Sequence, residues 1–157
     1  MLLLFCACFF IFIISKIKLW HITYESLIFS FQYDEQTAKS KAITDADVIV
    51  VCYSAVDRES FENVKSYWVP EIRKLNKKKP VVLVATQSDI RDENNSDHVS
   101  DTEGQNLMKL INADYYNKCS AATNDGIKKV FESVGLATIR YRKKKTNVLK
   151  RVFGRWT

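Results

Sequence analysis

The sequence predicts a three-layer α/β domain with a mostly parallel sheet. Two valine-rich apolar runs, residues 48–53 and 81–85, are typical of strands that are buried on both faces. Between them, apolar residues recur at steps of three and four from Phe61 to Leu75, which indicates a helix. Because strands and helices alternate along the chain, we expect right-handed βαβ connections.

Composition supports one folded domain. The chain has 157 residues, of which 46% are hydrophobic, so it is long and apolar enough to build a sizeable core. Two of the four cysteines lie in apolar, strand-like runs, which indicates reduced, buried thiols and a cytoplasmic location rather than a disulfide framework. The cysteines are Cys6, Cys8, Cys52 and Cys119.

The N-terminal third is the least determined part. Residues 1–15 are apolar, but a run of this length is shorter than the ~20 residues that span a bilayer as a helix. Three interpretations remain open: an anchoring or signal-like segment, a buried pair of strands at residues 9–14 and 17–22, or residues foreign to the native protein. Residues 16–44 show no clear period, and only a short helix near residues 34–41 is expected.

The remaining elements follow in order. Pro70 is expected to kink the helix over residues 61–75, and the lysines at 77–79 are interpreted as its solvated end. Ser100 and Glu103 have the spacing of a capping box, which starts a second helix. The apolar face of that helix is assigned to Leu107, Leu110 and Ile111. A short strand is expected at residues 115–119. A last helix from Asp125 or Gly126 is expected to bury Ile127, Val130, Phe131 and Val134.

Polar residues follow two of the predicted strands. In open α/β sheets, ligands bind beyond the carboxyl ends of the strands, and Asp89 lies just after one such end. A carboxylate accepts two parallel hydrogen bonds, which fits the N1–H and 2-amino groups of guanine but not adenine. A turn or a helix cap is the alternative role for this Asp. After the next strand, the main-chain N–H of Ala121 is placed to donate to guanine O6.

These two loops resemble a known family. Thr86-Gln87-Ser88-Asp89 resembles the guanine-specificity motif of small GTPases, in the form that Rho-family members use, and Cys119-Ser120-Ala121 resembles their second base motif. Residues 46–54, 60–64 and 68–72 resemble Rho-family strands and helices. The resemblance covers residues 45–145, about two thirds of the chain. It implies a P-loop-GTPase-like G-domain that is incomplete at its N-terminus, with residues 45–141 as its C-terminal two thirds and residues 142–157 as a basic tail.

The resemblance also implies a function, a GTP/GDP switch in small-GTPase signalling. Thr86 would belong to the base motif, Gln87 would lay its stem along the base and Asp89 would read guanine. Ser120 and Ala121 would close over the base. The sequence identifies no effector or regulator proteins.

Other parts of the family pattern have no counterpart. The family's glycine-rich phosphate loop ends in Gly-Lys-Ser/Thr and holds the phosphates and Mg²⁺, whereas the first 103 residues here contain no glycine. Lys18-Leu19-Trp20 resembles the end of the family's third strand, but His21 follows where the catalytic Asp-Thr-Ala-Gly-Gln should begin. The similar string at residues 101–105 follows the base motif and is explained as a helix start. No catalytic residue and no Mg²⁺ ligand is therefore assigned.

The affinity expected for a guanine nucleotide follows from its hydrogen bonds to the carboxylate. Hydrogen bonds to a charged group contribute about 1.5–3 kcal/mol each. Two of them support about millimolar binding at best, once the cost of immobilising the ligand is included. We therefore expect weak or no nucleotide binding by this chain, and no GTP hydrolysis.

The basic charge is concentrated at the C-terminal end. Residues 140–157 carry eight cations and no acid, so the other 139 residues sum to −2 within the total of +6. Because the domain shows no basic face, nucleic acid is not an expected partner. The stretch from Arg140 to Arg155, with apolar residues interleaved, fits either an anionic membrane surface or a frayed helix end. A membrane-associated interaction module without nucleotide is thus the second functional hypothesis, at the cytoplasmic face of a membrane.

Overall fold

The computed structural model describes residues 11–15, 25–29 and 36–153, and the side chains of residues 40–144 and of Thr146. Its five-stranded sheet has the order β2-β1-β3-β4-β5. The strands are β1 (Ile11–Ser15), β2 (Glu25–Phe29), β3 (Val48–Ser54), β4 (Val81–Thr86) and β5 (Tyr115–Lys118). Strands β3, β4 and β5 are parallel, whereas β1 pairs antiparallel with both β2 and β3.

The register aligns the ends of the parallel strands. Ser54 pairs with Thr86, and Ala85 pairs with Lys118. We call this side of the sheet, where Ser54, Thr86 and Lys118 end their strands, the carboxyl edge. The opposite side, where Val48, Val81 and Tyr115 begin their strands, is the amino edge.

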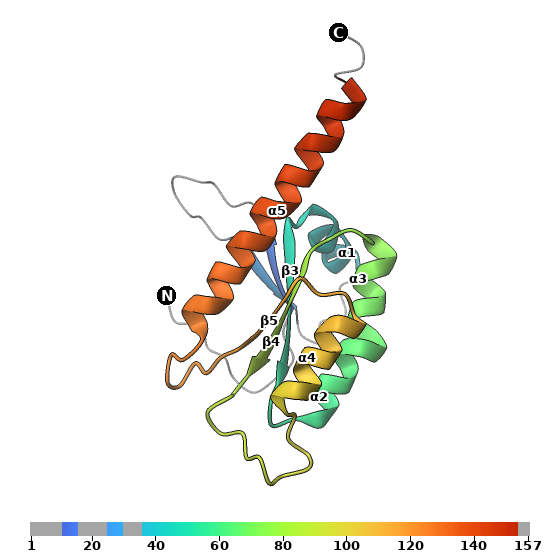
Figure 1. The fold of residues 1–157 in the computed structure, drawn as a ribbon. Helices are drawn as coiled ribbons and strands as arrows, with labels where there is room; N and C mark the ends of the chain where they lie inside the picture. The colour runs from blue at the N-terminus through green and yellow to red at the C-terminus, as the bar shows by residue number, and fades with distance from the viewer. Residues whose placement is uncertain (1–10, 16–24, 30–35, 154–157) are drawn as a thin grey trace.

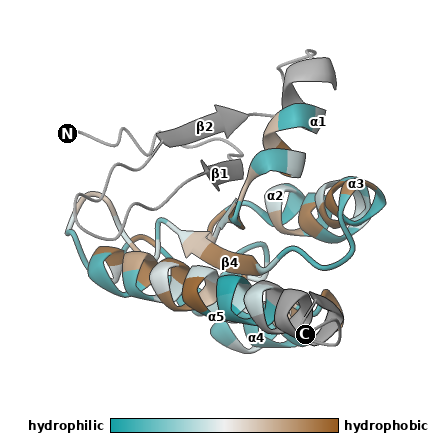
Figure 2. Ribbon diagram, turned by 90° about the horizontal axis from the view of Figure 1, so that it is seen from above, coloured by the Kyte–Doolittle hydropathy of each residue, from teal (hydrophilic) through white to brown (hydrophobic). Residues whose placement is uncertain are grey.

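Helices cover both faces of the sheet, which confirms the three-layer α/β architecture (Figure 1; Figure 2). Helices α1 (Gln36–Asp45), α2 (Arg58–Asn63), η1 (Val64–Trp68), α3 (Val69–Leu75) and α4 (Asp101–Leu110) lie on one face, and α5 (Ile127–Phe153) lies on the other. Alternate residues of the strands supply the two core layers. Ile49, Val51 and Tyr53 pack with the first group of helices, and Val48, Val50 and Cys52 pack with α5.

The structure describes part of the N-terminal third of the chain. Strand β1 at Ile11–Ser15 overlaps the predicted strand at 9–14, while the predicted partner at 17–22 lies outside the described residues. The helix expected near 34–41 is α1, which buries Ala42 and Ile43. No helix in the described part of the chain is long and apolar enough to cross a membrane. Cys52 and Cys119 are free, buried thiols, as expected, and Cys6 and Cys8 lie outside the described residues.

The predicted kink at Pro70 is a short π-helical segment. Helix α2 passes into η1, and α3 then begins with Pro70 in its first turn. Pro70 has no N–H, and its ring crowds the carbonyl four residues earlier. The π-helical turn is wider, because the Val69 N–H donates to the Val64 carbonyl, five residues back. This wider turn makes room for the proline ring.

The capping box is present as predicted. The Ser100 hydroxyl accepts a hydrogen bond from the Glu103 N–H at 3.2 Å, and the Glu103 carboxylate accepts one from the Ser100 N–H at 2.8 Å. Leu107 and Ile111 of this segment are buried, but Leu110 is 61% exposed, so its assignment to the apolar face was wrong. The final turn of α4 points Leu110 away from the sheet while Leu107 and Ile111 stay on one side.

Helix α5 begins at Ile127, one or two residues after the predicted start. Val134 is buried, and Ile127 and Val130 pack half-buried against the same core. Phe131 is also half-buried.

Lys79 corrects the interpretation of residues 77–79 as a solvated helix end. Lys77 and Lys78 are exposed, but Lys79 is only 6% exposed. Its Nζ donates to the carbonyl of Ala46 and lies 5.6 Å from the centre of the Tyr141 ring. Lys79 is buried because it leads directly into β4, where α5 covers the chain.

Candidate functional site

Two loops meet at the carboxyl edge. The loop after β4 contains Gln87, Ser88 and Asp89, and the loop after β5 contains Ser120 and Ala121. The Ser88 N–H donates to the Cys119 carbonyl at 3.3 Å, and the Cys119 N–H donates to the Ala85 carbonyl at 2.8 Å. Parallel pairing of β4 and β5 therefore brings together both segments that resemble base-binding motifs.

Thr86 and Gln87 are fixed by β3. The Thr86 hydroxyl donates to the Tyr53 carbonyl at 3.0 Å. Gln87 adopts a left-handed conformation, with φ of 56°, and its side-chain oxygen accepts a 2.6 Å hydrogen bond from the Ser54 hydroxyl. The Gln87 side chain thus lies against the end of β3, with its amide oxygen bonded to Ser54.

The Asp89 carboxylate lies in the loop after β4. This side chain is exposed, and it makes no hydrogen bond or ion pair with any residue that the structure describes. A carboxylate that formed a turn or a helix cap would accept a nearby N–H, as Asp92 does from Asn94 at 2.9 Å. Asp89 therefore keeps its acceptor positions available for a ligand.

The loop after β5 is held by its own contacts. Ser120 is buried, its N–H donates to the Asp125 carbonyl at 2.9 Å, and its hydroxyl accepts the Thr123 N–H at 3.2 Å. Ala121 is exposed, and its N–H has no hydrogen-bond partner among the described residues. Ser120 therefore shapes the loop, whereas Ala121 presents a donor to solvent.

Gly126 closes the same loop in a conformation that favours glycine. Its φ is +70°, and a Cβ at this position would lie 2.0 Å from the Lys118 carbonyl oxygen. No larger residue fits this backbone without movement of the loop.

Ser54 is the member of this edge that sequence reasoning missed. Its hydroxyl both donates to Gln87 and accepts the N–H of Val56 at 3.2 Å. A signal was present, because Ser54 directly follows the first apolar run, and parallel strands of matching length place such residues side by side.

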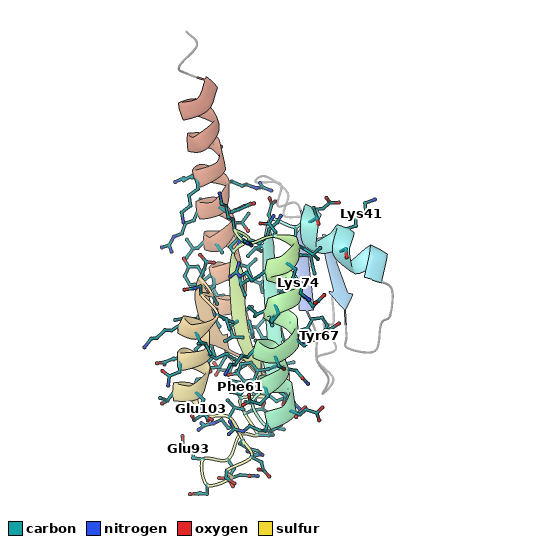
Figure 3. The ribbon with its side chains drawn as sticks, turned by 90° about the vertical axis from the view of Figure 1, so that its right-hand side faces the viewer. Lys41, Phe61, Tyr67, Lys74, Glu93 and Glu103 are labelled. Carbon is teal, nitrogen blue, oxygen red and sulfur yellow. The ribbon has the colours of Figure 1, made fainter. Side chains whose placement is uncertain are left out.

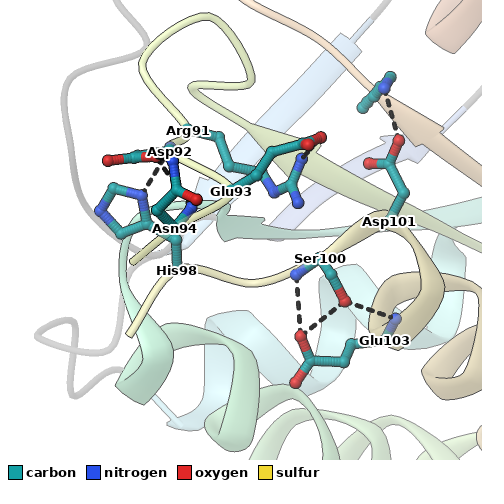
Figure 4. Close-up of polar contacts among 9 residues, drawn as sticks. Arg91, Asp92, Glu93, Asn94, His98, Ser100, Asp101 and Glu103 are labelled. Atoms are coloured by element: carbon teal, nitrogen blue, oxygen red, sulfur yellow. Dashed lines mark hydrogen bonds and ion pairs between the residues drawn. The ribbon is translucent and has the colours of Figure 1, made fainter. Parts of the chain in front are cut away.

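Arg58 fixes the rest of the loop before α4. Its guanidinium donates to the carbonyls of Ser96 and His98, at 3.1 and 2.8 Å, and forms an ion pair with Glu103 at 2.5 Å. The hydrogen bond from Arg58 lowers the pKa of Glu103 to about 2, helped by the bonds from Ser100. The segment around this carboxylate is shown in Figure 4, where Asp92 also donates its N–H to His98 Nδ1.

A model of the Ras family matches residues 32–140. The chain belongs to the Ras family. The Rho-related GTP-binding protein RhoV of rat, cow and human is 36% identical over 121 residues in each case, which cover 71% of this chain and 51% of each relative. These relatives confirm the Rho-type resemblance, and the chain spans about half the length of the curated relatives it matches.

The Mg²⁺ that accompanies nucleotide in the Ras family finds no matching donor set in the described part of the chain. No cluster of three His, Cys, Asp or Glu side chains suited to a metal ion occurs there. At the end of β3, the Asp57 carboxylate instead accepts the Ser60 N–H at 3.2 Å and caps α2. The acidic side chains of the described residues therefore offer no cluster for Mg²⁺.

Proposed function

We propose that this Rho-type chain recognises guanine nucleotides, GTP or GDP, through the base alone. The observation that carries the proposal is the exposed, uncommitted Asp89 beside a second loop whose Ala121 N–H is also uncommitted. The Ser88–Cys119 hydrogen bond couples these two loops. Recognition of guanine by a small GTPase-like domain is the first event of a GTP/GDP switch.

Each site residue has a distinct role in this proposal. Asp89 accepts the N1–H and 2-amino protons of guanine, and the Ala121 N–H donates to O6. Gln87 provides the aliphatic stem on which the base lies, with its amide held by Ser54. Thr86 and Ser120 touch no base. They position the two loops through their bonds to Tyr53 and Thr123.

The same contacts limit the affinity. Two hydrogen bonds to a carboxylate, at about 1.5–3 kcal/mol each, support about millimolar binding after the cost of ordering the ligand. Mg²⁺ and the phosphates are left out of this proposal, because the first 103 residues contain no glycine for a phosphate loop. We therefore propose that this chain by itself does not hydrolyse GTP.

The test is an NMR titration of the ¹⁵N-labelled chain with GMP and AMP. We expect GMP, but not AMP, to shift the amides of Ser88, Asp89 and Ala121. The variant Asp89→Asn should lose these shifts. Asp97→Asn is the matched control, since Asp97 is another exposed acid of the same loop. Equal shifts with GMP and AMP, or GMP shifts that survive in Asp89→Asn, would refute the proposal.

One observation favours a second function, the membrane-associated interaction module. Helix α5 continues through the basic stretch to Phe153 and extends past the sheet (Figure 1). A continuous basic helix fits an anionic membrane surface better than a frayed end does. In this proposal the chain lies at the cytoplasmic face of a membrane, where effector or regulator proteins would meet it, and Asp89 has no role.

A further inference from the structure

The loop between α3 and β4 lies against α5 at the amino edge. Lys79 makes the connection, because its buried Nζ donates to the Ala46 carbonyl and lies 5.6 Å from the centre of the Tyr141 ring. The C-terminal part of α5 projects past the amino edge (Figure 1). Two basic segments that are some sixty residues apart in sequence, 77–79 and 140–145, therefore occupy the same edge.

Exposed amines from both segments share this edge. Lys77 and Lys78 are exposed. Lys144 is also exposed and lies three residues after Tyr141, so it occupies the same side of α5, one turn further out. Asp47, before β3, forms an ion pair with Arg142 of α5. One exposed acid, Asp114, also lies at this edge directly before β5, and its carboxylate accepts the Val81 N–H at 3.1 Å.

The α3–β4 loop that carries Lys77 and Lys78 is firmly fixed. The Arg73 guanidinium donates to the carbonyls of Lys77 and Lys79, at 3.3 and 2.7 Å, and also to those of Ile111 and Asn112, at 3.4 and 3.2 Å. Arg73 therefore ties the end of α3 to the end of α4. The shallow hollow between these ends, about 550 Å³ in volume, is bordered by Lys77 and Lys78, by the acid Asp114 and by the exposed Leu110.

We propose, building on the membrane association proposed above, that Lys77 and Lys78 form one binding face with the basic stretch of α5, and that this face lies on an anionic phospholipid bilayer. Charge complementarity selects the bilayer, since cations from two separate elements reach the same edge and the apolar Leu110 lies beside them. The G-domain itself, and not only its tail, would then contact lipid.

This arrangement orients the domain. Glu93 lies on the loop beyond the carboxyl edge, at the opposite end of the molecule from the projecting end of α5 (Figure 3). With the amino edge on the bilayer, Asp89 and Ala121 face away from it. The guanine-binding edge then stays open to the cytoplasm.

The test is co-sedimentation of the full chain with vesicles of phosphatidylcholine, with and without phosphatidylserine. We compare Lys77→Ala/Lys78→Ala with Lys128→Ala/Lys129→Ala. Each pair removes two exposed lysines, but Lys128 and Lys129 lie in the first turn of α5, at the carboxyl edge. Each lysine near an anionic bilayer strengthens binding to it. We therefore expect the affinity for phosphatidylserine vesicles to fall about tenfold to thirtyfold in the first pair of variants, and about threefold or less in the second.

Equal losses of vesicle affinity in the two pairs of variants would overturn the proposal. The basic stretch of α5 would then be the sole contact with the bilayer. A wild-type chain that does not bind phosphatidylserine vesicles, or that binds pure phosphatidylcholine equally well, would overturn both this face and the membrane association. An acidic protein would then be the remaining partner class for the edge.

Two further measurements keep these outcomes separate from the nucleotide proposal. Lys77→Ala/Lys78→Ala should keep the wild-type urea midpoint, because Arg73 contacts only main-chain oxygens of this loop. It should also keep the wild-type shifts with GMP. Loss of vesicle binding with intact GMP shifts therefore supports the face without bearing on Asp89.

Discussion

The hydroxyl of Ser54 donates a 2.6 Å hydrogen bond to the side-chain oxygen of Gln87. This bond ties the end of β3 to the loop after β4, and Ser54 also accepts the Val56 N–H. Because Gln87 sits in a left-handed conformation directly before Ser88 and Asp89, the orientation of the proposed base-reading acid depends on this contact.

The first prediction concerns this contact. Ser54→Ala should lower the free energy of unfolding by about 1 kcal/mol, since a largely buried hydrogen bond is lost. Ser66→Ala is the control, because Ser66 is exposed within a helix and bonds only to the Glu62 carbonyl of the preceding turn. Urea denaturation should show a change of a few tenths of a kcal/mol or less for Ser66→Ala. Equal losses in the two variants would show that the Ser54–Gln87 contact adds no stability.

The second prediction uses two glycines of the same chain. Gly126→Ala should destabilise the fold by about 2 kcal/mol or more, because φ is +70° and the new Cβ would clash with the Lys118 carbonyl. Gly135→Ala should instead stabilise it by about 0.5–1 kcal/mol, since a Cβ on this helical residue meets nothing within 4 Å. Chemical denaturation of both variants checks the pair. A harmless Gly126→Ala would mean that the loop after β5 is not held as described.

The third prediction concerns pH. The hydrogen bond from Arg58 lowers the pKa of Glu103 to about 2, below its ordinary value of 4.5. A depressed carboxyl pKa stabilises the fold above the unfolded-state pKa, and this contribution disappears as the pH falls from about 4.5 to about 2. The stability advantage of wild type over Glu103→Gln should therefore be present at about pH 6 and vanish near pH 2. Urea denaturation across this range measures it, and a difference that is constant with pH would contradict the assignment.

The fourth prediction exchanges the base. Asn at position 89 offers one acceptor and one donor in place of two acceptors, so it fits the C2 carbonyl of xanthine better than the 2-amino group of guanine. Asp89→Asn should therefore lose the amide shifts with GMP and gain them with XMP. Asp97→Asn should keep the wild-type preference for GMP. The prediction fails if Asp89→Asn shows amide shifts with neither nucleotide, or equal shifts with GMP and XMP. Asp89 would then not contact the group at position 2 of the base.

The sequence was sufficient to locate those strands and helix starts that depend on local residue patterns. The valine runs located β3 and β4, and Ser100 with Glu103 located the start of α4. The meeting of the loops that contain Asp89 and Ala121 also followed from sequence, because the carboxyl ends of adjacent parallel strands share an edge.

Features that depend on packing could not be predicted. Lys79 contacts Ala46 and, in α5, Tyr141, both distant in sequence, and a run of three lysines gives no sign of these contacts. Leu110 fits a helical apolar pattern, yet no part of the described chain covers it. The left-handed conformation of Gln87 has no residue signature, since glycine and asparagine are the usual residues there.

In the proposed function, this chain holds guanine by its base, without a phosphate or metal site. The most direct measurement is a titration of the full chain with fluorescent GDP, with and without Mg²⁺. We predict dissociation constants of about a millimolar or weaker that do not change with Mg²⁺. Micromolar or tighter binding that requires Mg²⁺ would contradict the claim and would show that residues outside the described part of the chain hold the phosphates.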